Sequence, residues 1–156
     1  MNRMLPFILL PLLALPGCAA SRQPVAQGVA VPVPAGPFGE VAPQSLQPGQ
    51  CGLALWTVAP SARRIFWAYA APPVARMVID GRTLDLPRVE ESGEPLFGFP
   101  SHARYAAGTL SVSVDVDFES RSDLVGGAVV RAGTISYVDS AGAELILPVA
   151  GLLACQ

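Results

Sequence analysis

The stretch TLSVSVDVDF at residues 109–118 constrains the fold most strongly, because apolar and polar side chains alternate along it without interruption. Successive side chains of a β-strand point to opposite faces of the sheet, so this period of two predicts a strand with one buried face and one solvated face. Such strands are typical of antiparallel sheets that pack on one core. The apolar side would carry Leu110, Val112, Val114, Val116 and Phe118, and the polar side Ser111, Ser113, Asp115 and Asp117.

Further strand and turn signals continue from Cys51 to the C-terminus. Asp80-Gly81 lies between two short β-like runs and favours a type I′ hairpin turn, because both positions need positive φ. Ser140-Ala141-Gly142 and Gly126-Gly127 indicate two more turns. The runs CGLALWTV and RRIFWAYA are rich in β-formers, and 16 prolines and 15 glycines favour short strands and turns. We therefore expect an all-β domain at 51–156, a small antiparallel barrel or sandwich of about 7–8 strands.

The N-terminus has the pattern of a secretory leader. A short positive start at Asn2-Arg3 precedes an apolar run from Met4 to Leu15. This run is shorter than the ~20 apolar residues that a membrane-spanning helix needs, and its prolines would disturb a helix. Its length is that of the apolar region of a signal peptide.

The tetrapeptide Leu15-Pro16-Gly17-Cys18 follows the apolar run and resembles the lipobox of bacterial lipoproteins. The resemblance implies that residues 1–17 are a signal peptide and that Cys18 receives palmitate-type acyl chains, of which two or three anchor a protein firmly. Ala19 stands where an Asp would favour the inner membrane, so the implied location is the outer membrane, facing the periplasm. The alternative is an ordinary signal peptide with an incidental cysteine.

Residues 18–50 hold the anchor site and then a stretch rich in Pro, Ala and Gly. No apolar period of 2 or 3.6 survives its prolines, so we expect a disordered, semi-extended tether. The alternative is that VPVPAGP, at residues 31–37, is a proline-rich docking motif.

The chain has three cysteines, and an odd thiol in a secreted protein needs an explanation. If Cys18 carries lipid, Cys51 and Cys155 remain as a pair in an oxidising compartment. We expect them to form a disulfide that ties the two ends of the domain. The alternative is two buried free thiols.

Charge and motif content exclude several classes of function. Ten basic residues against twelve acidic ones leave no basic stripe for nucleic acid. His102 is the sole histidine, and the chain has neither a G-x-S-x-G elbow nor a phosphate-binding loop. With one His and a paired Cys51 and Cys155, ligands for a zinc site are lacking. We expect no enzyme, no catalytic residues, no metal site and no cofactor.

Two clusters of charged or aromatic residues are candidate sites. Asp115, Asp117 and Glu119 share one face of the predicted strand and could hold Ca²⁺, but a straight strand spreads such ligands, so a solvated face is favoured, with Arg131 pairing across. Arg63 and Arg64 precede three aromatics and could form a recognition patch. The favoured interpretation is that the aromatics alternate between core and surface.

The sequence PSHARYAAG contains Ser101-His102-Ala103-Arg104-Tyr105. This segment resembles the Ser-Gly-x-x-Tyr loop of the membrane-bound c-type lysozyme inhibitor family. The resemblance implies that Ser101 and Arg104 contact the catalytic carboxylates of a lysozyme and that Tyr105 is a packing residue. His102 stands where that family has Gly. The alternative is a strand-entry loop with Tyr105 anchored in the core.

The sequence thus predicts a lipoprotein of the cell envelope with a non-catalytic β-domain in a binding or structural role. Its partners would be the membrane, through lipid on Cys18, and a protein or peptidoglycan of the periplasm. Inhibition of a lysozyme-type glycosidase through Ser101 to Tyr105 is the alternative, and an envelope enzyme is the least favoured class.

Overall fold

The computed structural model of the protein describes residues 36–139 and 141–156. It contains strands and turns and, within these two ranges, no helix. The strands are β1 (Phe38–Gly39), β2 (Cys51–Thr57), β3 (Arg64–Tyr69), β4 (Val74–Ile79), β5 (Arg82–Ser92), β6 (His102–Ala107), β7 (Leu110–Glu119), β8 (Gly127–Val138) and β9 (Glu144–Cys155).

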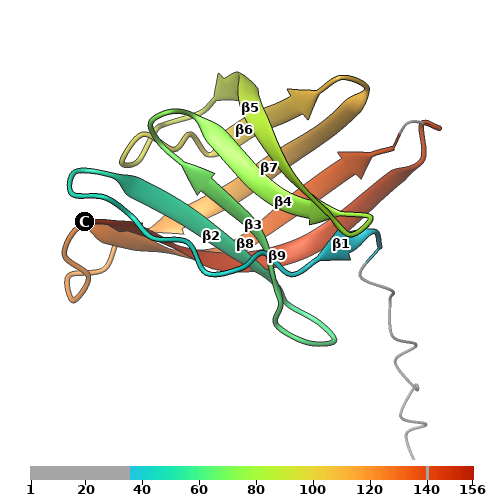
Figure 1. The fold of residues 1–156 in the computed structure, drawn as a ribbon. Helices are drawn as coiled ribbons and strands as arrows, with labels where there is room; N and C mark the ends of the chain where they lie inside the picture. Colours follow the sequence, from blue (N-terminus) through green and yellow to red (C-terminus); the bar gives the residue numbers. More distant parts are fainter. Residues whose placement is uncertain (1–35, 140) are drawn as a thin grey trace, which may run out of the picture. The chain divides into compact units, whose positions relative to one another are not determined.

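Strands β2 to β9 form a closed barrel in which every strand pairs antiparallel with the next one along the chain. The first and last of these strands, β2 and β9, also pair, and this contact closes the sheet. Figure 1 shows the strands in this sequential order around the barrel. The predicted all-β fold is confirmed, and of the two architectures that the sequence left open the structure has the barrel.

Local turn chemistry sets the tight hairpin between β4 and β5. Asp80 and Gly81 are the two connecting residues, with φ values of 49° and 74°. Both values lie in the left-handed region that a type I′ turn requires, and Asp and Gly occupy that region at low cost. The predicted turn at this dipeptide is confirmed.

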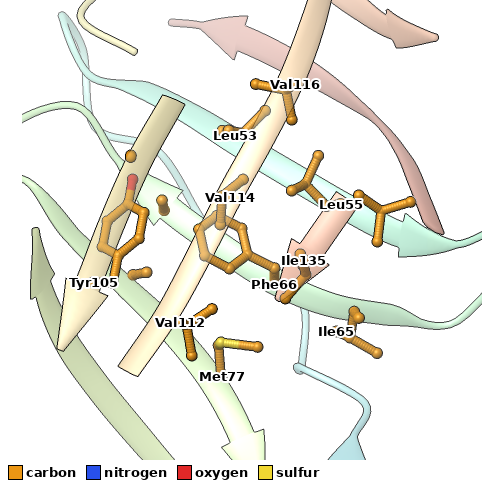
Figure 2. Close-up of a cluster of buried hydrophobic side chains, with 14 of the residues drawn as sticks. Leu53, Leu55, Ile65, Phe66, Met77, Tyr105, Val112, Val114, Val116 and Ile135 are labelled. Atoms are coloured by element: carbon orange, nitrogen blue, oxygen red, sulfur yellow. The ribbon is translucent and has the colours of Figure 1, made fainter. Parts of the chain in front are cut away.

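The inside of the barrel is filled with apolar side chains from all eight strands. The alternation of β7 has the predicted sense, because Val112, Val114 and Val116 are buried while Asp115 and Asp117 are exposed. Figure 2 shows the centre of this core, in which the labelled residues are Leu53, Leu55, Ile65, Phe66, Met77, Tyr105, Val112, Val114, Val116 and Ile135.

Aromatic packing and one strand irregularity complete the core. The rings of Phe66 and Tyr105 meet edge to face, with centroids 5.4 Å apart. The register between β2 and β3 shifts by one residue, so Ile65 joins Phe66 in the core although the two are neighbours in sequence.

The predicted disulfide joins Cys51 to Cys155. The two residues are direct register partners at the start of β2 and the end of β9, where the barrel closes. The bond spans a sequence separation of 104 residues. In the chain-entropy model, closing a loop of ~100 residues stabilises the folded state by about 4–5 kcal/mol.

The folded part extends further toward the N-terminus than the predicted start at Cys51. The tether was expected to extend to Gln50, but residues 36–50, the N-terminal segment, pack against the barrel. Within this segment, β1 pairs with the end of β4, and Phe38 is 3% exposed, with its ring against Tyr137. The segment is held by isolated side chains and by short backbone contacts to β4, Arg64 and Gln156. Contacts of this kind produce no periodic pattern in the sequence.

The N-terminal segment covers part of the outside of the barrel. Val41 is 1% exposed and packs with Ala54 and Trp67, whose side chains form an apolar cluster separate from the barrel core. Backbone hydrogen bonding adds to this packing, because the Val41 amide donates to the carbonyl of Arg64 at 2.7 Å. Strands β2 and β3 are therefore buried on both faces, which explains their near-continuous apolar sequences.

Candidate binding surface

The residues of the lysozyme-inhibitor resemblance do not lie on one loop. Ser101 is in a bend, directly before β6, and is half-buried against Gly93, where an added Cβ would lie 2.0 Å from the Ser101 hydroxyl oxygen. Its carbonyl accepts a hydrogen bond from the amide of Val116 at 2.9 Å. Arg104 and Tyr105 lie within β6 itself.

Arg104 and Tyr105 point to opposite sides of β6. The Arg104 guanidinium forms an ion pair with Glu90 on the outer face, and this hydrogen bonding lowers the pKa of the Glu90 carboxyl. Tyr105 is 1% exposed in the core, where burial raises the pKa of its phenol. The placement of Tyr105 matches a packing role, while Ser101 and Arg104 are set on different surfaces.

His102, also on β6, hydrogen-bonds through Nδ1 to Asp115 of β7. Ser92 of β5 faces His102 from the other side in register, so the order Ser-His-Asp occurs across three strands. The hydrogen bonds of the described ranges include none between Ser92 and His102, and the side chains of His102 and Asp115 are 44% and 52% exposed. The three residues form a polar row on an open surface.

The acidic row of β7 is engaged by neighbouring strands. Asp115 bonds to His102, and Glu119 pairs at 2.5 Å with Arg131 of β8, the residue that the sequence indicated as a cross-strand partner of this row. Among residues 36–139 and 141–156, no three His, Cys, Asp or Glu side chains gather in a way that would hold a metal ion.

The aromatic cluster of β3 is divided between the two faces of the strand. Phe66 points into the barrel, whereas Trp67 and Tyr69 lie on the outer face and are covered or bordered by the N-terminal segment. Arg64 donates from Nε to the carbonyl of Val41 at 3.0 Å and lies over the ring of Trp56, 6.0 Å from its centroid. Trp67 is therefore covered by the N-terminal segment while Tyr69 lies at the border of that segment, so the outward aromatics do not form one patch with Arg63 and Arg64.

A groove lies where the N-terminal segment borders the outer faces of β3, β4 and β5, and we call it the segment groove. Its volume is about 510 Å³. The residues that line it are Ser45, Gln47, Gln50, Tyr69, Pro72, Val74, Arg76 and Asp85. Sequence reasoning missed this groove because three of its residues belong to the stretch that we expected to be tether.

An ion pair with unused hydrogen-bonding capacity stands at one side of the segment groove. Arg76 donates to both carboxylate oxygens of its cross-strand partner Asp85, at 2.7 and 2.8 Å, and to Oε1 of Gln44 at 2.8 Å. Hydrogen bonding from Arg76 lowers the pKa of Asp85, and the same bond raises the pKa of Arg76. The pair is charge-neutral and partly open to solvent, with the two side chains 34% and 51% exposed.

Among the other hollows of the described ranges, two differ from the segment groove in their chemistry. One, of about 330 Å³, is lined by Ser101 together with the carboxylates of Glu94 and Asp117. The other, of about 430 Å³, contains Asp80 and Arg82 together with Tyr137, which is buried with 7% of its surface exposed. A half-buried aromatic beside a hydrogen-bonded ion pair is a feature of the segment groove.

Comparison with protein-family models, curated proteins and solved structures gave no match for this chain. Across residues 36–139 and 141–156 there is no helix of the length and apolarity that a bilayer crossing demands. Cys18 and the lipobox lie outside the described residues.

Proposed function

We propose that the protein is a lipid-anchored lipoprotein of the cell envelope whose barrel binds a partner on its outer surface without catalysing a reaction. The observation that carries the binding role is the filled interior. Many small barrels hold ligands inside, but here apolar side chains from every strand occupy that space. A ligand must then meet the outside, where the grooves and the polar side chains lie.

The anchor rests on Leu15-Pro16-Gly17-Cys18 and on the pairing of the other two cysteines. Because Cys51 and Cys155 are bonded to each other, Cys18 is left as the one cysteine without an assigned role. An acylated Cys18 at the head of a Pro-rich tether would place the barrel beside the outer membrane, facing the periplasm.

Metabolic labelling with palmitate tests the anchor. We expect the wild-type chain to incorporate label and to fractionate with membranes, and Cys18→Ser to lose both properties. A Cys51→Ser, Cys155→Ser double variant is the matched control, because it removes the other two cysteines and should still be labelled. An unlabelled wild-type chain in the soluble fraction would contradict the anchor.

Inhibition of a lysozyme-type glycosidase remains the alternative. It requires Ser101 and Arg104 to reach one catalytic cleft, although one side chain packs on Gly93 and the other pairs with Glu90. An assay of lysozyme hydrolysis with excess protein decides between the two functions. Stoichiometric inhibition that disappears in a Ser101→Ala, Arg104→Ala variant would support the alternative, and unchanged hydrolysis would remove it.

A further inference from the structure

We propose that the segment groove binds a neutral glycan, with a sugar ring against Tyr69 and hydroxyl groups bonded to the Arg76–Asp85 pair. This inference rests on the proposed function in one respect: it names the class of partner that an outward-facing binding barrel would take. The juxtaposition of a half-buried aromatic, two side-chain amides and a balanced ion pair in one groove carries the inference.

The size and charge of the groove select the ligand class. About 510 Å³ falls within the ~300–1,000 Å³ of small-molecule sites. Arg76 and Asp85 are the charged residues of its lining, and they neutralise each other through two hydrogen bonds. An anionic or cationic ligand would have to break that pair to find a counter-charge, whereas a neutral ligand leaves it intact.

The ion pair has capacity for hydroxyl groups. Of the five N–H groups of Arg76, three are used by Asp85 and Gln44 within the part of the chain that the structure describes. The carboxylate of Asp85 accepts one bond at each oxygen from Arg76 and has further lone pairs. The free N–H groups of Arg76 and the lone pairs of Asp85 thus form a neighbouring donor and acceptor. They match two adjacent hydroxyl groups of a sugar, because each hydroxyl can both donate and accept a hydrogen bond.

Apolar surface completes the match. Tyr69, Pro72 and Val74 line the same groove. The ring of a sugar has hydroxyls at its edge and C–H groups on its face, so it combines polar and apolar contacts on different sides. The ring of Tyr69 is the aromatic surface of the lining against which the C–H face would pack, and Gln47 and Gln50 belong to the same lining.

A peptide fits the groove less well because the sheet offers no free edge there. Peptides that add to a sheet need unpaired backbone groups. Strand β4 pairs with β3 and β1 on one side and with β5 on the other, so its backbone is already engaged. A proline-rich peptide would instead need several aromatic side chains, and the groove lining supplies Tyr69 alone.

The test is calorimetric titration of the full-length chain in a nonionic detergent whose head group is not a sugar. The probes are the β-1,4-linked tetramer of N-acetylglucosamine, maltotetraose and a proline-rich decapeptide. We expect saturable binding of at least one tetramer, with an affinity that does not change with salt because the ligand is neutral. Absence of saturable binding of both tetramers would overturn the inference, and so would binding of the decapeptide alone.

Variants assign the binding to the groove. Asp85→Asn should weaken binding about tenfold, because it removes an acceptor that bonds hydroxyls through a charge. Tyr69→Ala should abolish binding, and Tyr69→Phe, which keeps the ring, should stay within about threefold of wild type. Arg82→Gln, in a different hollow, is the matched control and should bind normally.

Unchanged affinity in both Asp85→Asn and Tyr69→Ala would overturn the inference even if a tetramer binds. Asp85 is half-exposed, so its variant tests the groove without threatening the fold. Palmitate labelling of Cys18 is independent of these titrations, and failure of glycan binding is thus distinguishable from failure of the anchor.

Discussion

The outer face of the barrel has two regions that differ in what covers them. Over β2 to β4 the N-terminal segment lies on the sheet, and Ala54 and Trp67 are 4% and 9% exposed. Over β6 to β8 the outer face is open, with the side chains of Asp115 and Arg131 52% and 75% exposed. Both regions belong to one closed sheet and share one interior core.

The sequences of these strands follow from that difference. A strand covered on both faces has apolar residues at successive positions, as in Leu53-Ala54-Leu55 of β2. A strand with one wet face alternates, as β7 does. An apolar run inside an otherwise alternating β-domain therefore indicates a second layer, and here a Pro-rich segment of the same chain provides it.

The largest expected effect is at Trp67, beneath the N-terminal segment. Trp67→Ala should destabilise the protein by about 3–5 kcal/mol, as large-to-small substitutions in buried clusters do. Ser113→Ala on the open face is the matched control and should stay within about 0.5 kcal/mol. Denaturant unfolding measures both variants. Similar midpoints for the two would show that the covered face is not a second core.

Trp67→Phe sharpens the same measurement. The indole N–H of Trp67 is buried without a hydrogen-bond partner among the described residues. Removing an unsatisfied donor offsets part of the lost ring area, so we expect a cost of only about 1 kcal/mol. A cost equal to that of Trp67→Ala would indicate that the indole N–H has a partner.

Val41 tests the N-terminal segment from its own side. Val41→Ala removes two carbons from a side chain that is 1% exposed, and we expect a loss of about 1.5 kcal/mol. Val125→Ala makes the same chemical change at a side chain that is 100% exposed and should be neutral. Thermal unfolding compares them, and equal melting temperatures would mean that the segment contributes nothing to stability.

The ion pair beside the groove predicts a small dependence on pH. Hydrogen bonding from Arg76 lowers the pKa of Asp85 below its ordinary value of 3.8, so its stabilisation is present above that pH and is lost as pH falls through the folded-state pKa. Solvent screening keeps the effect below about 1 kcal/mol. Asp85→Asn should be slightly less stable than wild type at pH 7, with the difference vanishing once the pH lies below the lowered folded-state pKa of Asp85. A difference that persists there would contradict the assignment.

The smallest effect is expected on the open face of β7 and β8. Glu119→Gln breaks an exposed pair with Arg131 and should cost less than about 0.5 kcal/mol, with the cost decreasing as salt is added. Urea unfolding at low and high ionic strength measures it. If Glu119→Gln lowered the free energy of unfolding as much as Val41→Ala does, the covered and the open outer faces would not differ in their contribution to stability.

Much of the barrel could be predicted because its signals are local. The alternation of β7 and the turn at Asp80-Gly81 depend only on residues close together in the sequence. The pair of Glu119 and Arg131 depends only on two strands that follow each other along the chain. The Cys51–Cys155 bond followed from counting cysteines. The segment groove could not be predicted, because Gln47 comes from one part of the chain and Asp85 from another, and no periodic pattern connects them.

The sequence by itself determined the all-β class and most of the strands, because side-chain alternation and turn dihedrals depend on residues that are close together in the chain. It also determined the pairing of two cysteines, because that follows from the number of cysteines in the chain. Only the tertiary structure decided between barrel and sandwich, since closure depends on β2 meeting β9 across the whole domain. It also showed that the folded part includes residues 36–50. Prolines at 37, 43 and 48 hide any strand period, yet the burial of Phe38 and Val41 against distant strands holds residues 36–50 on the barrel.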